Sequence, residues 1–281
     1  MQAIDPRLHH ESAVEIETEE LAKLMTLHHS MGVALPVRVC DCIIAEAEKL
    51  GFERSLHAAA NTVEQVSVSK GQLHRFAIGV EQKKLMLWSH TILYRLIDPL
   101  MRRLYGMQID NSWTDPFDTA RLKRACNDLF VSKYDATKVH RGDVLNGIRT
   151  HRDETQFAFV IALNGDFEGG GTLFVHYNNL VIRQPVGGLS LHPGFVAHAG
   201  VPISAGTRYI LAGFANVEPT RVDGQPNIVM PSARGVAALR DRIESRDVAT
   251  EFHTPISDVQ LARLMLYGPS QGLSDQVRDE E

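Results

Sequence analysis

The sequence has few cysteines and no long hydrophobic run. It contains three cysteines, Cys40, Cys42 and Cys126, in 281 residues. An odd number of cysteines in a chain long enough to bury a large core argues against a disulfide scaffold and favours a reducing compartment. No apolar stretch approaches the roughly 20 residues that a membrane-spanning helix needs. We therefore expect a protein that does not cross a membrane.

The N-terminus lacks the features of a targeting segment. Residues 1–20 carry six acidic side chains and no apolar central stretch, so they predict neither a secretory signal nor an Arg-rich transit peptide. An excess of positive charge is missing too, because 34 Asp and Glu residues face 29 Lys and Arg residues. A mildly acidic chain argues against broad nucleic-acid binding. We expect a cytoplasmic protein with no nucleic-acid partner and no membrane partner.

Hydrophobic periodicity predicts helices in the first half of the chain. Apolar residues recur at helical spacing over 36–51, with Gly51 at the expected C-terminal end, and again over 85–97, where Pro99 should end or kink the helix. A third amphipathic stretch covers 119–130. The helical pattern returns near 236–243 and 257–267.

Between these helical stretches the pattern changes to short apolar runs separated by Gly, Asn and Pro. The predicted strands are 157–163, 173–175, 180–182, 189–191 and 209–214. Many short strands at this spacing are typical of an all-β sandwich or barrel. The chain should then form a single domain in four parts: an N-terminal arm (1–35), helical support (36–130), a β core (131–217) and a C-terminal helical extension (218–281).

The residues most informative about chemistry are His151, Asp153 and His198. In an extended chain, residues two apart point to the same face, so His151 and Asp153 converge while Arg152 points away. His198 can join them only through the fold. Two imidazoles and one carboxylate on one side of an ion form the facial triad of non-haem Fe(II) oxygenases, whereas structural zinc prefers four ligands.

The short His-x-Asp motif is weak alone, because this chain has 13 histidines. A surface salt bridge or a buried structural histidine would explain each residue singly. The downstream context favours the metal site, since Arg208 follows His198 within the same predicted β region. A guanidinium is the natural bidentate partner of a carboxylate.

With these motifs in order, the chain resembles the Fe(II)/2-oxoglutarate-dependent dioxygenases, in particular their prolyl-4-hydroxylase-like branch. The resemblance covers about 134–214. It includes His151-Arg152-Asp153, the glycine-rich stretch 167–174, His198 and the basic Arg208.

The resemblance implies a mainly β fold with flanking helices, namely a double-stranded β-helix (jelly roll) packed against N-terminal and C-terminal helices. It implies that Fe(II) is held by His151, Asp153 and His198. The co-substrate 2-oxoglutarate would be bound by Arg208, with Tyr134 and Thr172 as further candidates. Dioxygen would be the oxidant, with stimulation by ascorbate.

The implied activity is oxidation of an unactivated C–H bond with release of succinate and CO2. A carboxylate at Asp153 favours hydroxylation, or related desaturation or ring closure, because halogenating relatives lack it. We expect a small-molecule substrate, such as a free amino acid or biosynthetic intermediate. The alternatives are a peptidyl-prolyl 4-hydroxylase, a non-catalytic jelly-roll binding module and a cupin-type metal enzyme that does not use 2-oxoglutarate.

Other features favour structural roles. Residues 165–172 resemble a phosphate-binding loop but lack its lysine and do not open a helix. His176 and His192 lie in the predicted β core and are interpreted as structural, and His28-His29 should be exposed outside it. Substrate specificity should depend on segments that flank the barrel. These are 109–118, 136–149 and the segment after Pro219.

Overall fold

The computed structural model describes residues 27–30, 32–54, 61–68, 80–140, 143–153, 155–175, 177–194, 196–226 and 249–252. The helices predicted at 236–243 and 257–267 lie outside these ranges, as does His176.

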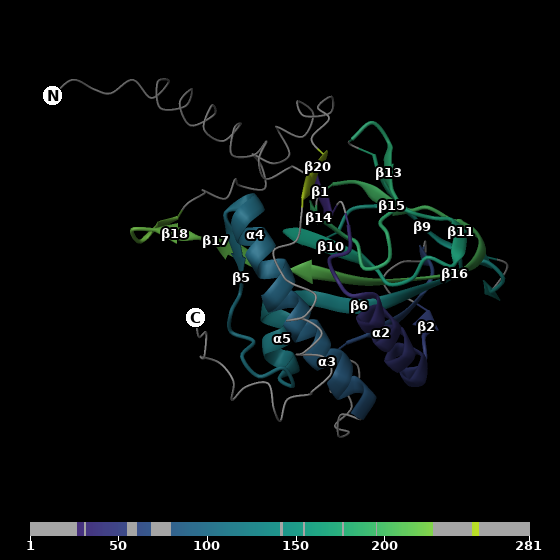
Figure 1. Ribbon diagram of the computed structural model, residues 1–281, viewed down its shortest axis with the longest axis horizontal. Coiled ribbons are helices and arrows are strands. Elements are labelled where there is room, and N and C mark those ends of the chain that lie inside the picture. The colour runs from purple at the N-terminus through teal and green to yellow at the C-terminus, as the bar shows by residue number, and fades with distance from the viewer. Residues whose placement is uncertain are drawn as a thin grey trace, which may run out of the picture.

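Two β-sheets form the centre of the molecule (Figure 1). The major sheet has the order β2 (Glu53–Arg54), β4 (Glu64–Ser67), β6 (Cys126–Asp135), β16 (Ile203–Ala215), β10 (Phe157–Ala162), β14 (Leu189–Pro193), β1 (Leu27–Ser30) and β20 (Ala249–Phe252), with β11 (Phe167–Gly169) paired to β16. The minor sheet has the order β13 (Leu180–Ile182), β12 (Thr172–Phe174), β15 (His198–Gly200), β9 (Gly147–His151) and β3 (Asn61–Thr62). Pairing is antiparallel except between β1 and β20.

The path of the chain identifies the fold. From β9 in the minor sheet it crosses to β10 in the major sheet, returns through β12 and β13, crosses to β14, returns to β15 and ends in β16. This alternation between two antiparallel sheets is a double-stranded β-helix, and the prediction of a jelly roll is confirmed.

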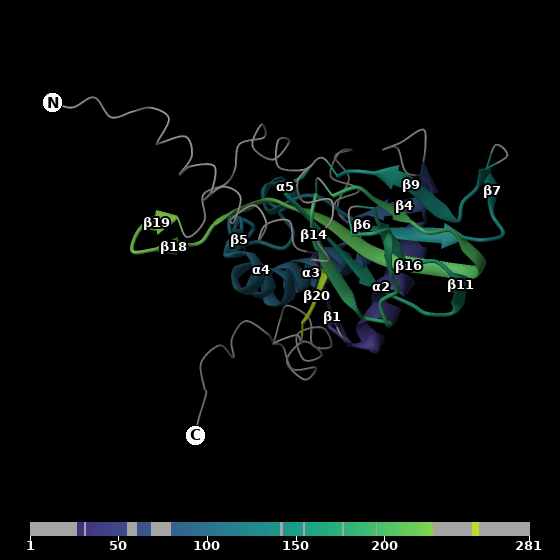
Figure 2. The same ribbon diagram turned by 90° about the horizontal axis from the view of Figure 1, so that it is seen from above.

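Short strand pairs extend both ends of this core. They are β5 (Met107–Ile109) with β17 (Val217–Pro219), β18 (Arg221–Val222) with β19 (Gln225–Pro226), and β7 (Val139–His140) with β8 (Asp143–Val144). Figure 2 shows β18 and β19 at one end of the molecule and β7 at the other.

Helices cover one face of the major sheet (Figure 1). They are α2 (Val37–Leu50), α3 (Val80–Ile92), a π-helical turn (Leu93–Ile97), α4 (Asp98–Tyr105) and α5 (Thr119–Ala125). The α2 stripe that includes Ile43 and Ala47 is buried, and the helix ends at Gly51, whose φ of +79° is accessible to glycine. The helix predicted to end or kink at Pro99 instead continues to Tyr105, with the π-helical turn directly before α4 and Pro99 in the first turn of α4.

Strand β10 at the centre of the major sheet is apolar on both faces. In β10, Phe157, Phe159 and Ile161 pack against the helices, whereas Val160 points toward the second sheet. All six residues of β10 are buried. A strand covered on both sides reads as a continuous apolar run, which is the pattern that the sequence shows here.

Two further predictions of local structure are wrong. The helix predicted over 119–130 ends at Ala125, and Cys126 begins β6. Pairing of β6 with β16 along its whole length outweighs the helical spacing of these side chains. The His28-His29 pair was expected to be exposed, but β1 pairs with β14 and His28 is only 7% exposed, packed against Tyr105.

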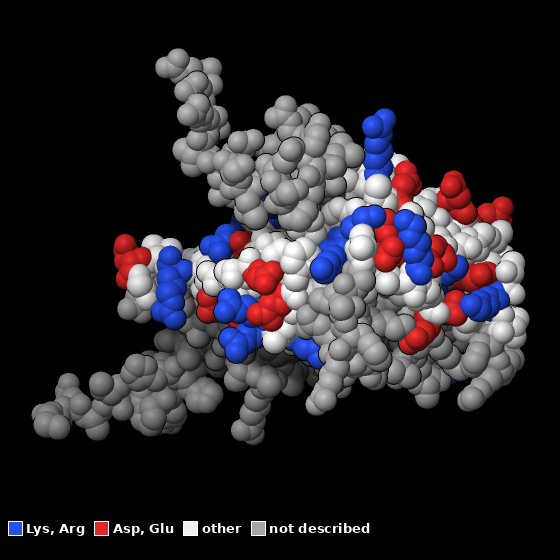
Figure 3. Space-filling view, turned by 90° about the horizontal axis from the view of Figure 1, so that it is seen from below, with Lys and Arg blue, Asp and Glu red and all other residues white. Residues whose placement is uncertain are grey.

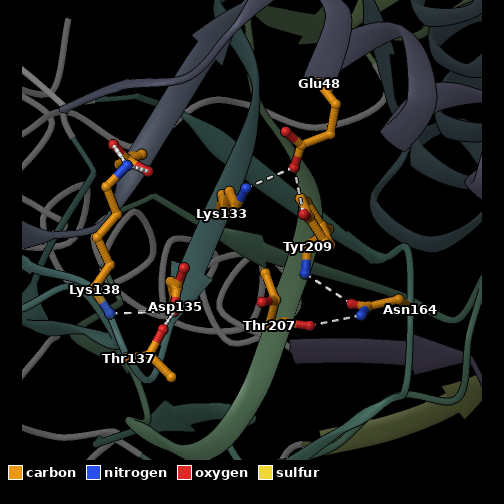
Figure 4. Close-up of polar contacts among 9 residues, drawn as sticks. Glu48, Lys133, Asp135, Thr137, Lys138, Asn164, Thr207 and Tyr209 are labelled. Carbon is orange, nitrogen blue, oxygen red and sulfur yellow. Dashed lines mark hydrogen bonds and ion pairs between the residues drawn. The ribbon is translucent and has the colours of Figure 1, made fainter.

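Polar contacts fasten α2 to the sheet beneath it. The Glu48 carboxylate accepts hydrogen bonds from Lys133 Nζ, at 2.7 Å, and from the Tyr209 hydroxyl (Figure 4). Nearby, the Asn164 side chain donates to Thr207 O and accepts from the Tyr209 backbone N–H. These contacts join α2, β6 and β16 and hold the sheet that carries Arg208.

The charged surface is mixed in sign. On the face seen in Figure 3, Lys and Arg side chains lie among Asp and Glu side chains rather than in one continuous basic area. Among the described helices, none has the length and apolarity required to span a bilayer.

Candidate metal centre and co-substrate pocket

The minor sheet brings His151 and His198 together. His151 ends β9, His198 begins β15, and the two residues stand opposite each other in the antiparallel register. Their ring centroids are 4.4 Å apart. Asp153 follows two residues after His151, and its backbone N–H donates to Gly194 O at 2.8 Å, which anchors the turn beside both rings.

The three side chains converge on one point. His151 Nε2 lies 3.4 Å from Asp153 Oδ1, and His198 Nε2 lies 3.5 Å from Asp153 Oδ2. All three donor atoms lie within 4.8 Å of one another. Asp153 and His198 are buried, whereas His151 is partly exposed. The site is therefore open on the side of His151.

Backbone carbonyls set the tautomers of both histidines. His151 Nδ1 lies 2.8 Å from Arg149 O, and His198 Nδ1 lies 2.9 Å from Val196 O. Because a carbonyl oxygen only accepts, each Nδ1 carries the proton and donates it. The lone pair of each neutral ring is then on Nε2, the atom that faces Asp153. Such hydrogen bonds from the second nitrogen orient metal-binding imidazoles in proteins.

The local charges keep the carboxylate ionised. Burial opposes ionisation of Asp153, yet a protonated His151 can donate Nε2–H to it when no metal is bound, and this interaction together with the nearby His198 and His192 holds the pKa of Asp153 below the usual value. Burial lowers the pKa of His198, which favours its neutral form. Burial also opposes protonation of His151, but the hydrogen bond with Asp153 raises its pKa.

This donor set fits Fe(II). Two imidazole nitrogens and one carboxylate oxygen lie on one side of a common point, and within the described residues no further His, Cys, Asp or Glu joins the group. A structural zinc site would be closed by four ligands. Three ligands on one side leave the remaining positions of an octahedral ion open.

The Arg208 guanidinium lies inside the barrel and has no acidic partner among the described residues. The residue is 3% exposed, Nη1 donates to Gly171 O at 2.9 Å, and the guanidinium carbon lies 4.8 Å from the Tyr134 ring centroid. No Asp or Glu of the described chain pairs with it, and burial lowers the pKa of Arg208. A buried cation without an anion is costly, so this position fits a ligand carboxylate.

Tyr134 and Thr172, the other two predicted co-substrate residues, lie close to Arg208. Tyr134 is its register partner in β6 and is 2% exposed. Thr172 follows Gly171 and stands opposite Gly200 in the minor sheet. A Cβ at Gly200 would lie 3.0 Å from the Tyr134 hydroxyl oxygen, so only glycine allows this close approach.

One polar residue of the barrel interior was interpreted from the sequence only as structural. His192 in β14 is fully buried, and its ring centroid lies 4.6 Å from that of His198. Burial lowers the pKa of His192 to about 3, so the ring is neutral. Because side chains alternate along β14, with Leu189 and Leu191 on the helix side, the sequence could have predicted that His192 points inward. It could not have predicted that the His192 ring lies beside His198.

The predicted specificity segments lie in different places. Segment 136–149 contains β7 and β8 and leads into β9, which ends at His151. Segment 109–118 packs on the helices, where His90 Nε2 donates to Trp113 O. Their role in substrate selection stays a prediction.

Comparison with known proteins adds sequence relatives. No family model matches the chain. Human procollagen-lysine,2-oxoglutarate 5-dioxygenase 1 is 31% identical over 185 residues, which are 63% of this chain and 22% of the relative. A multifunctional procollagen lysine hydroxylase and glycosyltransferase of Caenorhabditis elegans is 35% identical over 212 residues, 69% of this chain and 26% of the relative. The chain thus spans about a quarter or less of the length of the first of these relatives.

Solved structures with similar folds are more distant in sequence. The collagen prolyl hydroxylase of Paramecium bursaria Chlorella virus-1 is 13% identical with a TM-score of 0.43, covering 69% of this chain and 97% of the other. A Pseudomonas putida prolyl-4-hydroxylase is 12% identical with a TM-score of 0.44, covering 74% and 99%. The carbocyclase SnoK from nogalamycin biosynthesis is 13% identical with a TM-score of 0.45, covering 79% and 93%.

The sequence relatives and the order of the motifs agree. The matched curated proteins include a protein named as a 2-oxoglutarate dioxygenase, and the chain carries the His-x-Asp, distal His and basic residue in one jelly roll. The predicted resemblance of this chain to the Fe(II)/2-oxoglutarate-dependent dioxygenases is therefore confirmed.

Proposed function

We propose that the chain is an Fe(II)- and 2-oxoglutarate-dependent oxygenase that hydroxylates an unactivated C–H bond and releases succinate and CO2. The observation that carries the proposal is one barrel interior with two complementary sites. At one site two Nε2 lone pairs and a carboxylate converge. At the other a buried guanidinium has no anionic partner within the described part of the chain. A metal ion and a dicarboxylate complement these two sites.

Each residue has a defined task in this proposal. His151, Asp153 and His198 hold the iron, which supplies redox chemistry with dioxygen when it is bound. Arg208 has guanidinium N–H groups beyond the one that donates to Gly171 O, and these bind the distal carboxylate of 2-oxoglutarate. The Tyr134 and Thr172 hydroxyls donate to the same carboxylate. The apolar residues around Val160 and Ile210 keep water away from the pocket.

Asp153 also bears on the outcome of the reaction. Its carboxylate occupies the ligand position next to both histidines, so an anion such as chloride has no free position there. Hydroxylation is therefore the proposed reaction, with desaturation and ring closure as related outcomes.

The substrate we propose first is a small molecule, such as a free amino acid or a biosynthetic intermediate. A peptidyl side chain is the second candidate, because the matched curated proteins are named for lysine residues of procollagen. The two are separated by measuring succinate release with free amino acids and with lysine- or proline-containing peptides. Stimulation by peptides alone would exclude the small-molecule version.

The proposal is tested with purified protein, Fe(II), 2-oxoglutarate and ascorbate. We expect succinate formation that requires air and iron and that disappears in Asp153→Ala. A non-catalytic binding module would consume no 2-oxoglutarate. A cupin-type enzyme would turn over a substrate regardless of 2-oxoglutarate. Either result would contradict the proposal.

We also propose that the protein acts in the cytoplasm and forms one oxygenase domain. The three cysteines, which form no disulfide, support a reducing compartment. Cell fractionation of the tagged full chain tests the location, and recovery in a secreted or membrane fraction would contradict it.

A further inference from the structure

His192 occupies a special position on the inner face of the major sheet. It stands opposite the small residue Ala158 of β10, so no bulky neighbour on that strand covers it. Its ring packs between Phe174, at 5.1 Å between centroids, and His198, at 4.6 Å. His192 therefore lies directly beside a residue proposed to bind the metal.

The hydrogen bonds of His192 define which nitrogen is free. Nδ1 lies 3.1 Å from Pro193 O, and since a carbonyl oxygen only accepts, Nδ1–H is the donor. Nε2 then bears a lone pair and can only accept. Within the described residues this atom is buried and has no hydrogen-bond partner. Buried polar atoms in native proteins nearly always have a partner, so an acceptor left open in the barrel interior indicates a ligand.

The missing donor cannot be 2-oxoglutarate. At neutral pH the co-substrate offers two carboxylates and a ketone, all of which are acceptors. A lone pair facing such a group would be repelled. The organic substrate, the other molecule that enters the pocket, can supply an N–H or O–H donor, either in place of a water molecule or directly.

We infer that His192 determines substrate specificity: its Nε2 accepts a hydrogen bond from an N–H or O–H group of an amino acid or amino-acid residue, close to the carbon that is oxidised. This inference rests on the proposed function and names a chemical feature of its substrate. A site built around an unpaired acceptor rejects analogues that lack the donor, because binding them leaves the acceptor buried and unpaired.

Two substitutions separate hydrogen bonding from ring packing. His192→Phe keeps an aromatic ring against Phe174 and His198 but removes the acceptor. His192→Gln loses the ring but keeps an acceptor oxygen. Ser190→Ala is the matched control, because it removes a different buried polar group, the Ser190 hydroxyl, from the same face of the same strand.

The binding experiment uses the full chain loaded with Zn(II) and 2-oxoglutarate, which does not turn over. The probes are free L-lysine, L-proline and a peptide of Gly-Pro-Lys triplets, measured by calorimetry. We expect at least one probe to bind the wild type, with affinity reduced about tenfold or more in His192→Phe, partly retained in His192→Gln and unchanged in Ser190→Ala. Without a probe, His192→Phe should unfold at the same temperature as the wild type or higher, because an unpaired acceptor is removed.

Four results would overturn the inference. They are full probe affinity in His192→Phe, loss of affinity in His192→Gln alone, a lower unfolding temperature of His192→Phe together with lost Zn(II) binding, and failure of every probe to bind the wild type. Succinate release from 2-oxoglutarate without any probe is measured in parallel. If that release persists while the inference fails, the proposed oxygenase activity still stands.

Discussion

The two faces of the major sheet differ in how their side chains are packed and hydrogen-bonded. On the helix side, β10 and β14 present Phe159, Ile161, Leu189 and Leu191, all packed in one apolar cluster. On the inner side, the alternate residue His192 of β14 has an Nε2 atom with no hydrogen-bond partner in the described ranges. The same strands thus carry one face of packed apolar side chains and one face with a polar atom that has no hydrogen-bond partner among the described residues.

β16 shows the same division within one strand. Leu211 packs toward the helices, and Ile210 and Ala212 pack toward the barrel interior. Arg208 shares the inner face with Ile210 but has no anionic partner among the described residues. Because side chains alternate across a strand, the outer face can stabilise the fold while the inner face binds ligands. Substitutions on the two faces should therefore fail in different assays.

Asp153→Ala should have the largest effect on function. It removes one of the three proposed metal ligands and leaves His151 and His198 without the carboxylate between them. We expect loss of high-affinity Fe(II) binding and a fall in turnover of more than about 100-fold, beyond the loss typical for residues that only support ligands. Iron binding by calorimetry and succinate release measure it.

The exposed Asp166 provides the control for this change. Asp166→Ala should leave iron binding and turnover as in the wild type. Equal losses in both variants would mean that removal of any acidic side chain, rather than the position of Asp153 beside the two histidines, explains the result.

Arg208→Ala should be next in size. Removing the guanidinium deletes the bidentate partner proposed for the distal carboxylate, and losses of about 2–5 kcal/mol are typical of such truncations. We expect the KM for 2-oxoglutarate to rise by about 30-fold or more, with partial recovery in Arg208→Lys. Steady-state kinetics with varied 2-oxoglutarate measure it. An unchanged KM would show that Arg208 does not bind 2-oxoglutarate.

The sequence predicted features that depend on local patterns better than features that depend on contacts between distant parts of the chain. The triad and Arg208 were predicted from the order and spacing of their motifs and from the family resemblance, and the fold brings His151, Asp153 and His198 together. The long-range pairing of β1 with β14 buries His28, and no local pattern reports it. The helix predicted to reach residue 130 fails for the same reason, since β16 pairs with β6 from Cys126 onward. The hydrogen bond that leaves His192 Nε2 open depends on ring orientation, which sequence does not specify.

Ile161→Val tests the outer face. Ile161 is fully buried against the helices, and losing one methylene there should cost about 0.5–1.5 kcal/mol of unfolding free energy. Chemical denaturation measures this loss. The KM for 2-oxoglutarate and the affinity for iron should not change. A shift in either constant with little loss of stability would show that the two faces are not independent.

Glu46→Gln should have the smallest effect, because it lies outside both faces. Glu46 on α2 accepts from Lys84 Nζ on α3 at 2.9 Å and from Lys49 Nζ at 3.1 Å. Burial opposes its ionisation, but the two lysines hold the pKa of Glu46 below the usual value. A carboxyl with a lowered pKa stabilises the folded state above its unfolded pKa of about 4.3, and this contribution is lost as pH falls through the folded pKa.

The two lysines are largely exposed, so the ion pairs should contribute at most about 1 kcal/mol at pH 7. We expect Glu46→Gln to be slightly less stable than the wild type at pH 7, with the difference shrinking below about pH 4. Denaturation at both pH values measures it, with turnover as the control. If the stability difference between wild type and Glu46→Gln grows as the pH falls, the effect of burial on the Glu46 pKa outweighs that of the two lysines, and the prediction is wrong.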